Sequence, residues 1–66
     1  MASYKLLFLR DGEPIGQLSR HCADDADAIE AARQVSEEYT VEVCQDGRLV
    51  ARVMRDGRAL QYRRAG

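Results

Sequence analysis

The sequence predicts a small α+β domain of ββαββ order, with a mainly antiparallel four-stranded sheet and one helix packed on one face. Three observations predict it: apolar runs on either side of Asp-Gly at 11–12, helical periodicity at 25–38, and apolar runs on either side of Asp-Gly at 46–47. With 66 residues, five glycines, one proline and a net charge of −1, the chain belongs to the folded class. We expect one domain over residues 1–62 and a frayed basic tail over 63–66.

The first two strands form a predicted hairpin. Residues 3–10 are aromatic and aliphatic, and the turn sequence that follows them favours a strand over a helix. Residues 13–20 return antiparallel, but Pro14 cannot donate a ladder hydrogen bond and Gly16 weakens a strand. We therefore expect the second strand to be a ragged strand at the edge of the sheet.

A single helix follows, because apolar residues recur at spacings of three and four over residues 25–38. Asp24 is the best candidate for the N-cap. Asp25 and Asp27 would then lie in the first turn, where negative charge complements the helix dipole.

The second hairpin is predicted from residues 40–45 and 48–54. Its loop length follows from which apolar side chains would share a face of the sheet. A two-residue loop would scatter the apolar side chains over both faces, whereas a three-residue loop, Gln45-Asp46-Gly47, gathers them on one face. We predict the three-residue loop, with residues 58–62 left open as a short extra strand. This loop places on the core face Val41, Val43, Leu49, Ala51 and Val53. It places on the opposite face Glu42, Cys44, Arg48, Val50, Arg52 and Met54, with Glu42 in reach of the arginines.

Four stretches carry a resemblance to known proteins: Tyr4-x-Leu6-x-Phe8, Asp24-Asp-Ala-Asp-Ala-Ile-Glu-Ala-Ala32, Val41-Glu-Val, and Gly47-Arg-Leu-Val-Ala-Arg-Val53. Over about residues 4–53 the chain resembles the short uncharacterised bacterial ββαββ proteins that are classed as domains of unknown function. The resemblance implies a bacterial cytoplasmic protein and brings no catalytic residue with it.

Composition narrows the class of protein further. Two cysteines are too few to staple a secreted domain of this size, and no secretory leader is recognisable at the start of the chain. No apolar run approaches the ~18 residues that a membrane span needs. We therefore expect a cytoplasmic protein.

Charge is divided along the chain. Residues 11–46 carry ten acidic side chains against two basic ones, whereas residues 48–66 carry six arginines against one aspartate. We interpret the basic hairpin as a binding surface for an acidic protein partner. The residues assigned to partner binding are Arg48, Arg52, Arg55 and Arg58. The alternative is nucleic-acid binding by the same arginines, which a pI of about 5.7 and an acidic helix disfavour.

Self-association is predicted from the apolar residues that the helix cannot cover. Leu7 and Leu9 alternate with Tyr4, Leu6 and Phe8 along the first strand, so both faces of this strand are apolar. A second copy packed by two-fold symmetry would bury the uncovered set and relieve the small core. The predicted dimer surface consists of Leu7, Leu9, Val50 and Met54.

Residues with catalytic chemistry are few. His21 and Cys22 are adjacent, and Cys44 could add a third ligand, but neither a catalytic arrangement nor metal-ligand spacing is present. A chain this short also has little room for a substrate pocket of about 300 Å³. We therefore expect a non-enzymatic interaction module that homodimerises, without cofactor or metal, or alternatively an accessory nucleic-acid-binding protein.

Overall fold

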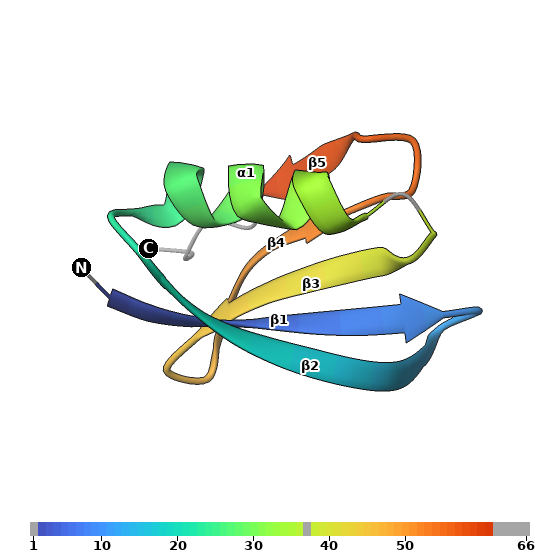
Figure 1. The fold of residues 1–66 in the computed structure, drawn as a ribbon, viewed down its shortest axis with the longest axis horizontal. Helices are drawn as coiled ribbons and strands as arrows, with labels where there is room; N and C mark the ends of the chain where they lie inside the picture. The colour runs from blue at the N-terminus through green and yellow to red at the C-terminus, as the bar shows by residue number, and fades with distance from the viewer. Residues whose placement is uncertain (1, 37, 62–66) are drawn as a thin grey trace.

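The computed structural model describes residues 2–36 and 38–61, and it confirms the α+β class (Figure 1). One five-stranded antiparallel sheet has the order β2-β1-β3-β4-β5, with α1 packed on one face. The elements are β1 (Ala2–Arg10), β2 (Glu13–Cys22), α1 (Asp25–Val35), β3 (Thr40–Gln45), β4 (Arg48–Val53) and β5 (Ala59–Gln61). The fifth strand corrects the four-stranded prediction, and the tail at 63–66 lies outside the described residues.

Helix α1 begins where its caps are satisfied. The Asp24 side chain accepts a hydrogen bond from the Asp27 backbone N–H at 2.9 Å, which confirms Asp24 as the N-cap. The Asp27 carboxylate in turn accepts from the Ala23 N–H at 3.0 Å. At the other end the Ser36 N–H and hydroxyl both donate to the Arg33 carbonyl, so the helix ends at Val35 instead of continuing to 38.

Strands β1 and β2 form a hairpin through Asp11 and Gly12, which both have positive φ values, of 51° and 82°. This is the geometry of a two-residue turn whose twist matches that of the strands. Strand β2 lies at the edge of the sheet, as predicted. Its pairing shifts where Leu9 lies opposite Pro14 and Phe8 opposite Gly16, which leaves Ile15 as an extra residue in a bulge.

The second hairpin differs from the prediction at its loop. Gln45 pairs with Arg48, so the loop has two residues, Asp46 and Gly47, with φ values of 50° and 76°. A bulge then restores the core face: Cys44 pairs with Leu49 and Val43 with Ala51, so the residue between, Val50, is inserted.

The two-residue loop overturns the face predicted for three residues, Arg48, Leu49 and Val50. Val50 is buried at 3% exposure beside Ala51, and it belongs to the core, not to the uncovered face. Leu49 is half-buried and lies opposite Cys44 on the other side of the sheet. The predicted core positions of Val41, Val43 and Val53 are confirmed, and all three are fully buried.

The core lies between α1 and the sheet. Leu6 of β1 is fully buried against the central valines, and the helix contributes Ile29 with the small residues Ala28 and Ala32. Alanines at the contact allow the helix to approach the sheet closely. Over the described part of the chain, α1 is too short to cross a membrane.

Candidate functional site

The candidate site is the face of the sheet turned away from α1, which we call the outer face. Side chains alternate along a strand, so Leu7 and Leu9 lie opposite to the buried Leu6. Directly paired residues of neighbouring strands share a face, which extends this surface across the sheet. With Met54 at its end, the outer face includes Lys5, Leu7, Leu9, Thr40, Glu42, Cys44, Leu49, Arg52 and Leu60.

One row of side chains crosses all five strands of this face. The row runs Gln17, Leu7, Glu42, Arg52, Leu60. Its centre is an ion pair and its flanks are leucines, with Leu60 exposed at 52%. Exposed apolar groups around a neutralised charge pair are typical of surfaces that bind another protein.

The outer face is hollowed at both ends. A shallow groove of about 450 Å³ is lined by Leu7, Leu9, Gly12, Pro14, Thr40, Glu42, Arg52 and Met54. A second hollow of about 370 Å³ lies beside Lys5, Leu7 and Cys44 and reaches the loop at Asp46 and Gly47. Both hollows can receive side chains of a partner that lies flat on the sheet.

The central ion pair confirms the predicted reach of Glu42 to an arginine. The Arg52 Nη2 and Nε both donate to one oxygen of Glu42, at 2.6 and 3.1 Å. The Glu42 side chain is exposed at only 19%, so a neighbouring cation is needed to offset the cost of its partial burial. The pair therefore leaves the middle of the outer face without net charge.

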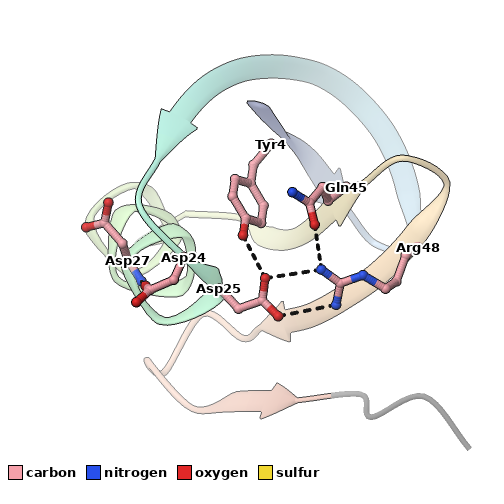
Figure 2. Close-up of polar contacts among 6 residues, drawn as sticks. All are labelled: Tyr4, Asp24, Asp25, Asp27, Gln45 and Arg48. Atoms are coloured by element: carbon pink, nitrogen blue, oxygen red, sulfur yellow. Dashed lines mark hydrogen bonds and ion pairs between the residues drawn. The ribbon is translucent and has the colours of Figure 1, made fainter. Parts of the chain in front are cut away.

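Arg48 is not on the outer face, which corrects the prediction. Because Arg48 precedes the bulge, it lies on the helix side of β4, where it meets the first turn of α1 (Figure 2). Its guanidinium donates to both oxygens of Asp25 at 3.2 Å and to the Gln45 amide oxygen at 2.6 Å. The hydroxyl of Tyr4 donates to the same Asp25 carboxylate at 2.7 Å. Asp25 thus joins both hairpins to the helix, through Tyr4 of β1 and Arg48 of β4.

The charges of this cluster shift the pKa values of its members. Hydrogen bonds from Arg48 and then from Tyr4 hold the pKa of Asp25 below its usual range. The hydrogen bond to Asp25, together with burial of the ring, raises the pKa of Tyr4 to about 12. Both shifts favour the arrangement of ionised Asp25 and neutral Tyr4 in the folded protein at neutral pH.

The two remaining predicted arginines lie around the turn between β4 and β5. Arg58 pairs with Asp56, with its Nε at 2.8 Å from Oδ2, while Arg55 is exposed in the same turn. The four arginines therefore form no single strip. Arg48 lies on the helix side of the sheet and Arg52 on the outer face, while the turn holds Arg55 and Arg58.

Three of the four residues assigned to the dimer surface come together on the outer face. Leu7, Leu9 and Met54 all line the same groove, whereas Val50 is in the core. The sequence analysis missed Leu49 and Leu60. Asp-Gly prefers two-residue turns, and such a turn at 46–47 places Leu49 on the outer face. The possible strand at 58–62 was the signal that could have placed Leu60 there.

The Cys22 thiol and the His21 imidazole belong to neighbouring residues at the end of β2, whose side chains lie on opposite faces of the sheet. Cys22 is exposed at 2%, while its neighbour His21 is exposed. Burial raises the pKa of both thiols, Cys22 and Cys44, which disfavours the reactive thiolate. Within residues 2–36 and 38–61, no three His, Cys, Asp or Glu side chains are grouped so as to hold a metal ion.

Comparisons with protein-family models, with curated proteins and with solved structures found no match to this chain. The resemblance to short bacterial ββαββ proteins therefore stays a prediction.

Proposed function

We propose that this protein is a non-enzymatic interaction module that homodimerises through its outer face. The observation that carries the proposal is the row across the sheet, in which Leu7 and the 52%-exposed Leu60 flank a neutral Glu42–Arg52 pair. Helix α1 covers the other face, and no described residue covers this one.

A second copy is the partner that the charges and the area favour. The ion pair at the centre is internally neutral, so the centres of two outer faces can meet without net repulsion. Strands about 4.8 Å apart with a rise of about 3.3 Å per residue give this sheet an area on the order of 500 Å². Two such faces bury roughly 1,000 Å², about the smallest area expected of a biological interface.

The internal pairing of the arginines weighs against binding through the basic hairpin. Arg48, Arg52 and Arg58 each already donate to a carboxylate of the same chain. A phosphate or an acidic partner would have to displace these carboxylates, which reduces the gain from each new contact. Nucleic-acid binding is therefore the alternative that the experiment below must detect.

The test is a native mass spectrum of the purified protein at low and moderate salt, with variants at the outer face. We expect two or more associated chains at both salt concentrations, and loss of the face contact in Leu60→Asp and in Leu7→Asp. Ala26→Asp is the matched control, because it places the same charge at an exposed position of α1. It should leave the association unchanged.

Two results would refute the proposal. One is a wild-type monomer, especially one carrying nucleic acid that salt removes, which would favour the alternative. The other is an assembly that Leu60→Asp and Leu7→Asp leave intact while circular dichroism shows that both variants are folded.

A further inference from the structure

Strand β2 presents a long edge to solvent. It is ten residues long, and nine of these residues are exposed. Strand β1 lies on one side of it, and no described strand lies on the other (Figure 1). An edge strand of this kind directs backbone N–H and C=O groups outward, where another strand can pair with them.

Only half of this edge is protected. Pro14 and the bulge at Ile15 lie in residues 13–15, and both features hinder further strand pairing. Residues 16–21 pair regularly with β1 and contain neither a proline nor a bulge. Their ionisable side chains are those of Arg20 and His21. Apart from the charge of Arg20, residues 16–21 therefore lack the protection that edge strands normally carry.

An apolar side chain marks the middle of the unprotected half. Leu18 lies opposite the fully buried Leu6, and so on the helix side of the sheet, yet it is exposed at 40%. Helix α1 therefore leaves this side chain partly uncovered. A strand added beside β2 would extend the apolar layer between the helix and the sheet across Leu18.

We propose that residues 16–20 pair antiparallel with the same residues of a second copy, about a two-fold axis at Leu18. The sheet then runs continuously through both chains. This surface is distinct from the outer face, so the inference goes beyond the proposed function and does not depend on it. Chains that use both contacts assemble as two continuous sheets stacked face to face, with four chains in all.

The register follows from symmetry and from the side chains. A two-fold axis perpendicular to the sheet keeps each face of the sheet on its own side, so a residue can pair only with one of the same parity. The register centred on Arg20 would oppose two positive charges directly. The register centred on Leu18 instead packs Leu18 on Leu18 of the second copy. It also places Arg20 opposite Gly16, which has no side chain to obstruct it.

Disulfide cross-linking tests the register directly. Opposed residues of an antiparallel pair lie about 4.5–5.5 Å apart between Cα atoms, within the range of about 4.4–6.8 Å that a disulfide spans. In a Cys44→Ser background, Leu18→Cys should therefore form a covalent dimer on mild oxidation. Cys22 remains in place because it is exposed at only 2%.

Arg20→Cys in the same background is the matched control. In the proposed register its Cα lies roughly 13 Å from its counterpart, four residues of strand away, so no cross-link should form. A Leu18→Cys chain that cross-links no faster than the Arg20→Cys chain would overturn the proposal. Faster cross-linking of Arg20→Cys would overturn the register and with it the argument from Leu18.

A charge substitution separates this contact from the outer face. Leu18→Asp opposes two aspartates at the axis and should reduce a four-chain assembly to two chains in the native mass spectrum. Leu60→Asp should also give two chains, and these should still cross-link through Leu18→Cys. If Leu60→Asp has no effect while Leu18→Cys cross-links, the outer-face proposal fails and the edge proposal stands. If Leu60→Asp disrupts the assembly while Leu18→Cys does not cross-link, only the edge proposal is refuted.

Discussion

Replacing Tyr4 by phenylalanine should destabilise the fold by about 1.5 kcal/mol, at the lower end of the range for a hydrogen bond to a charged group. The Tyr4 ring is exposed at 3%, and its hydroxyl donates to Asp25 at 2.7 Å. Phenylalanine keeps the packing of the ring and removes only that donor. Asp25 retains both hydrogen bonds from Arg48, and its side chain is 47% exposed to water, so no carboxylate is left unsatisfied. This is why the lower end of the range applies.

Urea unfolding followed by circular dichroism at pH 7 measures this loss, at one protein concentration because association also changes the apparent stability. For a domain of this size, about 1.5 kcal/mol lowers the Tm by roughly 6–12 °C. Tyr39→Phe is the matched control, since its hydroxyl only accepts an exposed contact from Arg10 at 3.5 Å. It should change the free energy of unfolding by less than about 0.5 kcal/mol. Equal stabilities for Tyr4→Phe and Tyr39→Phe would refute the role assigned to the cluster.

Three further predictions test the cluster and the second hairpin. The pKa of Tyr4 is raised to about 12, so the unfolded chain ionises first, and stability should fall as the pH rises from about 10 toward about 12. The pKa of Asp25 is lowered, so its contribution to the free energy of unfolding should be present above about pH 4 and lost as the pH falls through its folded pKa. Urea unfolding at a series of pH values measures both effects. A free energy of unfolding that does not change with pH in these two windows would contradict both predictions. Val50→Ala removes two methyl groups from a side chain exposed at 3% and should cost about 2 kcal/mol. Leu49→Ala, at a half-buried position on the outer face, should cost less, and the opposite order would refute the sides assigned to Val50 and Leu49.

The elements with local signals were predictable from the sequence. Asp24 caps α1 because its short carboxylate can reach the N–H of Asp27 whatever the rest of the chain does. The two Asp-Gly turns lie where they were expected, because glycine and aspartate tolerate the positive φ values that such turns require. Pro14 likewise predicted an edge strand because it lacks a backbone donor.

The candidate site was predicted less completely. Leu7, Leu9 and Met54 were assigned to one uncovered surface and do line one groove. The place of Leu60 on the outer face depended on whether β5 forms. Three residues after a turn form a strand only if the edge of a neighbouring strand is available to pair with them. The strand order decides that availability, and it is not written in any local pattern.

Local chemistry in the chain thus determined the class of fold, the helix cap, the turns and the edge position of β2, because each depends on a few adjacent residues. Tertiary packing determined the bulge in β4. A two-residue turn alone would place Val50 inward opposite Val43 but would leave Ala51 and Val53 outward, and the inserted residue turns both of them inward against α1. The bulge is preferred because it buries Ala51 and Val53 in the core, a gain that exists only once the helix lies on the sheet.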